Sequence, residues 1–187
     1  MKNNIIYIML FIGLLSCKAQ TISLDQLSQC ENGPNCPDYL YLKDTNNRLN
    51  NFVGIWKGTY AEDGRTYEFH FTKKENDYSF GKYWDILIGR ILVKKDNLEI
   101  ANTLNSSDQD AMFSGFIFDK YLKKYEMYYS GNADCNDKGR VYISFPDPNN
   151  LNQMRLVFIQ DMDIVENCPN GYKTVIPDAK ILMLTKQ

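Results

Sequence analysis

Histidine, the side chain whose pKa best suits acid–base chemistry near neutral pH, occurs once in this chain. His70 alternates with apolar residues along a predicted strand and shares its polar side with Glu68 and Thr72. This spacing predicts a solvated strand residue, not a catalytic base or a metal ligand. One histidine is also too few for an ordinary zinc site, and no Gly-x-Ser-x-Gly nucleophile motif occurs. We therefore expect no enzymatic activity, no metal and no cofactor.

The segment 134–139 reads Asp-Cys-Asn-Asp-Lys-Gly and has the polar composition of a calcium-binding loop. Two positions argue against such a loop. Lys138 occupies a ligand position, and Phe145 stands where a bidentate glutamate is needed. We expect a polar turn here.

The N-terminus has the pattern of an export signal. Lys2 precedes an uncharged apolar run of 11 residues that ends at Leu15. At about 1.5 Å per helical residue this run covers about 17 Å, roughly half of a ~30 Å hydrocarbon core. The pattern therefore predicts a signal peptide over residues 1–16 and not a membrane span.

The residues that follow this run suggest a membrane anchor. Leu14-Leu15-Ser16-Cys17 resembles the bacterial lipobox, which implies that Cys17 is acylated and becomes the first residue of the mature protein. Several acyl chains on one residue hold a protein stably at a membrane. Because Lys18 replaces the Asp that commonly retains such proteins at the inner membrane, the resemblance implies the outer membrane. The alternative is cleavage after Ala19, which would release a secreted or periplasmic protein.

Export places the remaining cysteines in an oxidising compartment. An even number there predicts two disulfides, with three possible pairings among Cys30, Cys36, Cys135 and Cys168. Cys135 and Cys168 lie just outside a predicted hairpin, at the same end of it, so we expect them to pair. Cys30 and Cys36 would then pair locally. Cross-pairing that ties the N-terminal segment to the rest of the domain is the alternative.

Composition limits the partners. The chain has 21 Lys and Arg against 23 Asp and Glu, a net charge of −2, which disfavours a nucleic-acid surface. Aromatic residues make up 13%, enough to build a core and to exclude disorder. We expect membrane contact through the N-terminal lipid and no nucleic-acid partner, and no particular protein partner is indicated.

From residue 51 the apolar residues alternate with polar ones, as in β-strands that bury one face. Short polar links separate nine such segments, so neighbouring strands should be antiparallel. The segments are 52–60, 67–72, 83–93, 98–104, 112–119, 124–130, 140–145, 154–160 and 181–185. We predict an all-β fold over 51–187, an antiparallel up-and-down β-barrel of eight to ten strands. Residues 17–50 would form the anchor, a tether and a short helical lead-in, with helix starts at Ser23 and Asp44.

Two resemblances accompany this pattern. Gly54-x-Trp56, just after a short helix, resembles the opening strand of the calycins, the lipocalins and fatty-acid-binding proteins, which implies that the indole plugs the barrel floor. The chain departs from them, since no helical lid separates the first two strands and no long helix follows the last. As a whole, the Ser-Cys-Lys start, Cys30-x5-Cys36 and Leu87-Ile88-Gly89-Arg90 resemble uncharacterised flavobacterial-type lipoproteins, whose domain has no known function.

In fatty-acid-binding proteins an Arg-x-Tyr on a late strand holds the ligand carboxylate inside the barrel, and Arg140-Val141-Tyr142 resembles it. Residues two apart share a face, so Arg140 and Tyr142 could point inward together, with Trp56 as a further lining residue. The alternative places Val141 and Ile143 in the core and turns Arg140 and Tyr142 outward, which the alternation favours.

Four tyrosines near 124–130 also allow two interpretations: Tyr121, Tyr125, Tyr128 and Tyr129. Exposed, they could contact carbohydrate or protein; buried, Tyr125 and Tyr129 belong to an inward face, which we favour. The sequence thus predicts an anchored, non-enzymatic module that binds a small apolar or amphipathic ligand in a barrel. The alternative is a ligandless structural or protein- or glycan-interaction module of the envelope.

Overall fold

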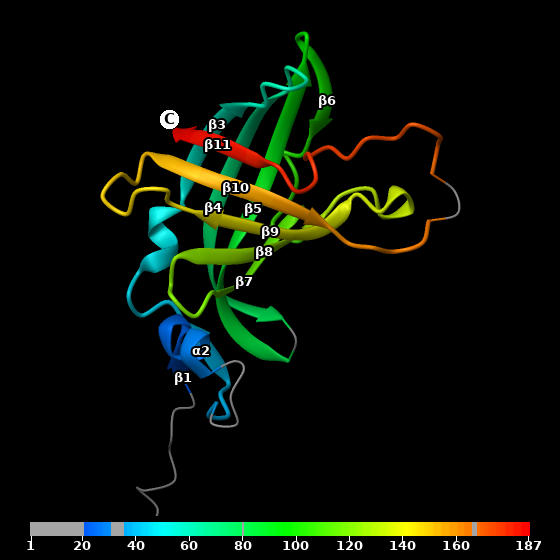
Figure 1. The fold of residues 1–187 in the computed structure, drawn as a ribbon. Coiled ribbons are helices and arrows are strands. Elements are labelled where there is room, and N and C mark those ends of the chain that lie inside the picture. Colours follow the sequence, from blue (N-terminus) through cyan, green and yellow to red (C-terminus); the bar gives the residue numbers. More distant parts are fainter. Residues whose placement is uncertain (1–20, 31–35, 80, 166–167) are drawn as a thin grey trace, which may run out of the picture.

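Eight antiparallel strands close into a barrel in the computed structural model, which describes residues 21–30, 36–79, 81–165 and 168–187. β11 pairs with β3 and so joins the two ends of the sheet, with Thr185 opposite Lys57 (Figure 1). The predicted fold class is confirmed. The barrel strands are β3 (Gly54–Thr59), β4 (Thr66–Ser79), β5 (Lys82–Lys95), β7 (Phe113–Phe118), β8 (Lys124–Ser130), β9 (Lys138–Ser144), β10 (Gln153–Gln160) and β11 (Ile181–Lys186).

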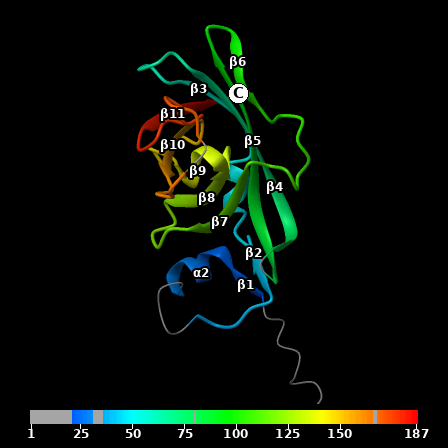
Figure 2. The same cartoon turned by 90° about the vertical axis from the view of Figure 1, so that its right-hand side faces the viewer.

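One of the nine predicted strands lies outside the barrel. β6 (Leu98–Asn102) pairs only with the end of β5, and β7 takes the place beside the middle of β5. β4 and β5 are 14 residues each, longer than the other barrel strands, so their hairpin extends beyond the barrel at both ends (Figure 2). A strand of this length can hold different partners along one edge.

The N-terminal segment docks on the start of β5. β1 (Thr21–Ser23) and β2 (Tyr41–Lys43) add two short parallel strands there, which the sequence did not predict. Between them lies α2 (Leu24–Cys30), which begins with a capping box. Its Gln26 N–H donates to Ser23 Oγ at 3.0 Å, and the Ser23 N–H donates to Gln26 Oε1 at 2.9 Å. The helix start expected at Ser23 is therefore present.

A second short helix leads into the barrel, as expected. The 3₁₀-helix η1 (Arg48–Asn51) begins where the Asp44 carboxylate accepts the N–H groups of Arg48 at 2.8 Å and Leu49 at 3.1 Å. These bonds satisfy donors that a helix start leaves free. The buried Asp85 carboxylate in turn accepts the Asp44 N–H at 2.9 Å and the Tyr41 hydroxyl at 2.5 Å. The two carboxylates thereby tie the lead-in to β5.

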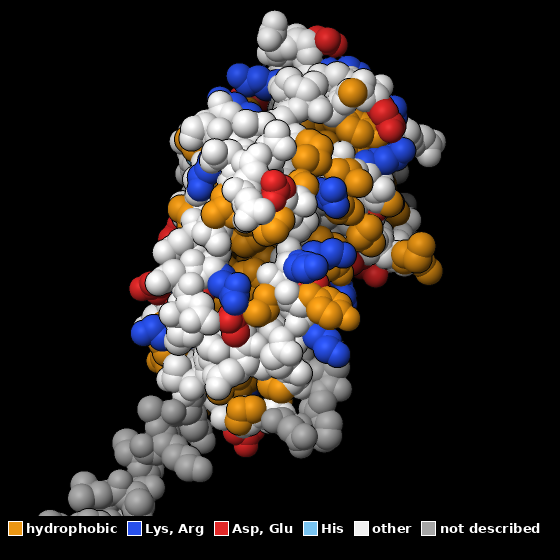
Figure 3. Space-filling model, turned by 60° about the vertical axis from the view of Figure 1, so that its left-hand side comes forward, with side chains coloured by type: hydrophobic (Ala, Val, Ile, Leu, Met, Phe, Trp, Pro, Cys, Tyr) orange, Lys and Arg blue, Asp and Glu red, His pale blue; other side chains and the backbone are white. Residues whose placement is uncertain are grey.

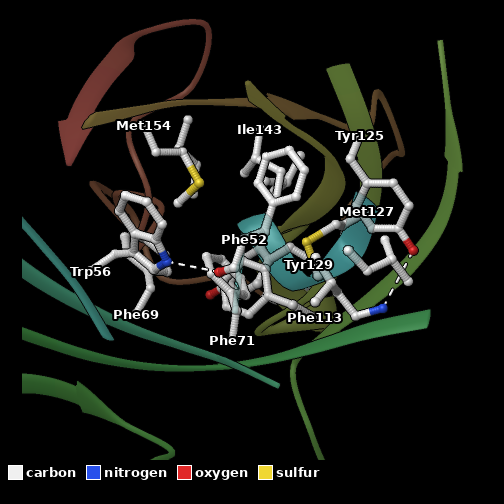
Figure 4. Packing of buried hydrophobic residues seen from close by; sticks show 14 of the residues in the cluster. Phe52, Trp56, Phe69, Phe71, Phe113, Tyr125, Met127, Tyr129, Ile143 and Met154 are labelled. Atoms are coloured by element: carbon white, nitrogen blue, oxygen red, sulfur yellow. Dashed lines mark hydrogen bonds between the residues drawn. The ribbon is translucent and has the colours of Figure 1, made fainter. Parts of the chain in front are cut away.

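The barrel interior is packed with side chains, most of them from alternate strand positions. Trp56 lies fully buried and its indole N–H donates to the Phe52 carbonyl at 2.8 Å (Figure 4). Gly89 makes room for rings, since a Cβ there would lie 2.7 Å from Phe71 and 2.9 Å from Phe113. Other side chains that fill the centre include Tyr67, Phe69, Tyr125, Met127, Tyr129, Val141, Ile143, Met154, Leu156 and Phe158. The inward face predicted for Tyr125 and Tyr129 is confirmed.

Candidate binding site

The predicted ligand cavity inside the barrel is occupied by the protein's own rings. Phe145 stacks on Phe52 at 4.6 Å between ring centroids and lies 6.2 Å from Trp56. This group of three rings closes the end of the barrel next to η1. Trp56 therefore lies in the barrel as expected, but it acts as packing there.

The inward placement considered for Arg140 and Tyr142 is wrong. The Arg140 side chain is 62% exposed and its Nη1 lies 3.4 Å from Glu126 Oε1 on the outside of β8. Tyr142 is half-buried on the same outer wall, opposite Glu126. Val141 and Ile143 are fully buried and take the inward positions. Because a strand alternates, burying this apolar pair turns Arg140 and Tyr142 outward together.

The four paired cysteines lie at disulfide distance in the predicted combination. The Cα atoms are 4.8 Å apart for Cys30 and Cys36, and 4.7 Å apart for Cys135 and Cys168. Cys17 and the predicted signal peptide lie outside the described residues.

A hollow of about 430 Å³ lies on the outside of the ring group, and we call it the mouth cleft. Its apolar floor is formed by Phe145 with Leu122 and Leu151. Its rim carries Lys124 and Arg155 and further basic and polar side chains. Figure 3 looks toward this side of the barrel, where hydrophobic and basic side chains lie interleaved. The combination of apolar floor and basic rim is that of a site for an anion with an apolar part.

The cations of the mouth cleft differ in their partners. Arg48 is held by Asp25, with distances of 2.6 and 2.9 Å, and the pKa of Asp25 is lowered chiefly by this hydrogen bond. Lys123, Lys124 and Arg155 form no ion pair within the described part of the chain. Three exposed cations in one hollow repel one another, so an anion there would lower the electrostatic energy.

A tight turn positions the two lysines. Asp119 accepts the backbone N–H groups of Lys123 at 2.6 Å and Lys124 at 2.9 Å. Leu122, between them and Asp119, has a positive φ of 57°. The Asp119 carboxylate thus orders the backbone of the turn, which places both lysines at the cleft.

The opposite end of the barrel holds a buried polar group that the sequence did not reveal. Asp137 is fully buried; its Oδ2 accepts the Tyr172 hydroxyl at 2.9 Å and the Val175 N–H at 3.1 Å. Burial raises the pKa of Asp137. Arg65, from the β3–β4 turn, donates to the carbonyls of Thr174 and Val175, both at 2.7 Å. We call Asp137, Arg65, Tyr172 and Val175 the Asp137 cluster, and it holds the loop before β11 against the barrel.

The expected polar turn at 134–139 is present, but it is not fully solvated. η2 (Ala133–Cys135) starts at Asn132, whose side chain accepts the Asp134 N–H at 3.1 Å. Asp137 follows this helix, and its side chain is buried under the loop 168–178, which lies more than thirty residues later in the sequence. Its position two residues after Cys135, which pairs with Cys168 in that loop, is the local signal of its burial.

His70 lies on the outer wall, half-buried, with its Nε2 at 2.6 Å from Glu68 Oε1. Lys57 Nζ lies 2.9 Å from the other oxygen, and the His70 hydrogen bond is the main cause that lowers the pKa of Glu68. Across the residues that the structure describes, no group of three His, Cys, Asp or Glu side chains is arranged to hold a metal ion. None of the described helices has the length and apolar character to cross a membrane.

Comparison with known proteins assigns the chain to a family. A family of unknown function, DUF6705, matches residues 1–176. The chain belongs to this family. No curated protein and no solved structure matches the chain. Membership of DUF6705 agrees with the expected domain of unknown function and supplies no mechanism.

Proposed function

We propose that this DUF6705 protein is an exported, lipid-anchored envelope protein that binds an anionic amphipathic molecule in the mouth cleft and catalyses no reaction. The observation that carries the proposal is the set of three cations without ion partners, Lys123, Lys124 and Arg155, around an apolar floor. A ligand with a phosphate or carboxylate head and a short apolar chain satisfies both parts of the site.

Each interaction with such a ligand contributes modestly to the free energy of binding. Each exposed ion pair contributes about 0.2–1 kcal/mol, and each CH₂ group buried on Phe145 and Leu151 contributes about 0.8 kcal/mol. The volume of about 430 Å³ suits a head group and part of a chain. Because rings fill the barrel, the chain of the ligand would lie across the mouth and not inside.

Export and anchoring rest on the N-terminal sequence. The run of apolar residues before Cys17 supports a signal peptide, and two cysteine pairs at disulfide distance fit an oxidising compartment. Metabolic labelling with an alkyne fatty acid tests the anchor. The wild-type chain should incorporate the label and fractionate with the outer membrane, and Cys17→Ser should lose both. A soluble, unlabelled wild-type protein would favour cleavage after Ala19.

A ligandless interaction module is the second candidate, favoured by the filled interior. Calorimetric titration separates the two candidates. Dodecyl phosphate below its micellar concentration should bind. Inorganic phosphate lacks the apolar chain and dodecyl maltoside lacks the anionic head group, so each should bind at least tenfold more weakly. The variant Lys124→Gln/Arg155→Gln should lose about tenfold in affinity, about 1.4 kcal/mol. The control Lys95→Gln, on the far end of β5, should bind as the wild type does. No binding of dodecyl phosphate by the wild type would reject the ligand and favour the second candidate.

A further inference from the structure

A second hollow, of about 740 Å³, lies on the outer wall of the barrel, and we call it the wall groove. It runs from the lead-in across β7, β8 and β9, the strands that lie above α2 in Figure 1. Adjacent strands are about 4.8 Å apart, so the crossing from β7 to β9 spans about 10 Å. The wall groove does not share a lining residue with the mouth cleft.

Aromatic side chains from four different segments form its apolar surface: Tyr39, Trp84, Phe116 and Tyr128. All four are partly exposed. Tyr39 and Trp84 meet edge to face, with ring centroids 6.1 Å apart. The face of an aromatic ring carries partial negative charge, and the C–H groups of a pyranose ring are slightly positive, so the two stack well.

Hydrogen-bond donors and acceptors both lie among these rings. Arg140 supplies N–H donors and lies 3.4 Å from Glu126, while Asp161 accepts the Tyr128 hydroxyl at 2.6 Å. These contacts hold the charged groups in place and leave them accessible, since the side chains of Arg140 and Glu126 are 62% and 26% exposed and Asp161 is half-buried. A ligand rich in hydroxyl groups can donate to the carboxylates and accept from the guanidinium at once.

The same lining disfavours two other ligand classes. The lining carries one cation, Arg140, against the carboxylates of Glu126 and Asp161. Lys82 Nζ lies 3.9 Å from the Tyr39 ring centroid, so the groove has no excess positive charge that would attract the anions expected at the mouth cleft. The floor consists of strands whose two edges are already paired, as β8 is with β7 and β9. A peptide therefore cannot add a strand there and would have to bind through its side chains alone.

We propose that the wall groove is a carbohydrate site that takes a neutral oligosaccharide, with its rings on Tyr128 and the neighbouring aromatics and its hydroxyls on Arg140, Glu126 and Asp161. This site is additional to the mouth cleft and does not depend on it. Together with an N-terminal anchor it would hold a glycan against the barrel wall.

Titration of the full-length protein, purified in its exported form, with maltotetraose, cellotetraose and N-acetylchitotetraose tests the site. We expect at least one tetraose to bind with a Kd of 1 mM or tighter, a threshold of about −4 kcal/mol. Arg140→Gln, at an exposed position, should weaken it at least fivefold, and Tyr128→Phe, which loses only the hydroxyl bound to Asp161, should weaken it less. Tyr121→Ala removes a 73% exposed tyrosine outside the groove and should leave affinity within twofold.

Saturation of the mouth cleft with dodecyl phosphate should leave tetraose binding unchanged, which separates this site from the proposed function. The proposal is overturned if no tetraose binds at 10 mM, or if binding is the same in Arg140→Gln and Tyr121→Ala. A lysine-rich peptide that binds the wild type and binds Glu126→Gln more weakly, while the sugars do not bind, would overturn it in favour of a protein partner.

Discussion

Replacing the buried Asp137 by Asn should change how stability depends on pH. Burial raises the pKa of Asp137 above the value of 3.8 that holds in the unfolded chain. The folded protein therefore binds this proton more tightly, and the free energy of unfolding falls as pH rises from 3.8 to the folded pKa. Above the folded pKa the loss is complete. The amide of the Asp137→Asn variant carries no charge, so the variant should be free of this loss.

The size of the effect follows from linkage. One proton corresponds to about 1.36 kcal/mol for each pH unit between the two pKa values. Asn can keep the acceptor that Tyr172 and Val175 use, and its amide nitrogen takes the place of Oδ1, which has no hydrogen-bond partner in the described structure. The unpaired atom, which costs about 1–3 kcal/mol, is thus common to both proteins and largely cancels in their difference.

Urea unfolding at intervals from pH 4 to pH 8, with the disulfides intact, measures the difference. The free energy of unfolding of D137N minus that of the wild type should rise with pH, with a slope of at most about 1.36 kcal/mol per unit, and then become constant. D134N, at an exposed position in the same turn, corrects for the loss of one negative charge. A difference that is flat, or that falls with rising pH, would show that the hydrogen bonds from Val175 and Tyr172 and the charge of Arg65 outweigh burial, and would refute the raised pKa.

Three further changes test the packing and the covalent links. Trp56→Ala leaves a cavity in the core and an unpaired Phe52 carbonyl, so we expect a loss of about 3–5 kcal/mol in urea unfolding, whereas Ile55→Ala on the outer wall should cost under about 1 kcal/mol. Gly89→Ala places a Cβ against ring atoms 2.7 Å away and should cost about 1–3 kcal/mol, seen as a lower melting temperature. Cys135→Ser/Cys168→Ser opens a link with a sequence separation of 33 and should cost about 4 kcal/mol in the chain-entropy model. A variant that melts with the wild type would contradict the corresponding expectation.

Local patterns in the sequence were sufficient for most of the barrel. Alternation placed Tyr125 and Tyr129 inward and favoured the outward orientation of Arg140, because side-chain direction along a strand depends only on parity. The helix starts at Ser23 and Asp44 could be predicted because a capping side chain lies within five residues of the backbone N–H groups that it binds. The cysteine pairing followed from a hairpin whose two ends must coincide.

Contacts between distant segments were decided only by the tertiary structure. Whether the interior is a cavity or a core depends on the summed volumes of side chains that come from eight strands, which the local spacing of residues does not report. The burial of Asp137 depends on a loop more than thirty residues later, and Arg65 reaches carbonyls 109 and 110 residues along the chain. The wall groove likewise brings Tyr39 and Trp84 beside Arg140 through strand pairing. Sequence patterns determine which face of an element is apolar, but closure of the barrel determines which elements become neighbours. The candidate sites are formed by side chains from such neighbouring elements, so the sequence alone did not reveal them.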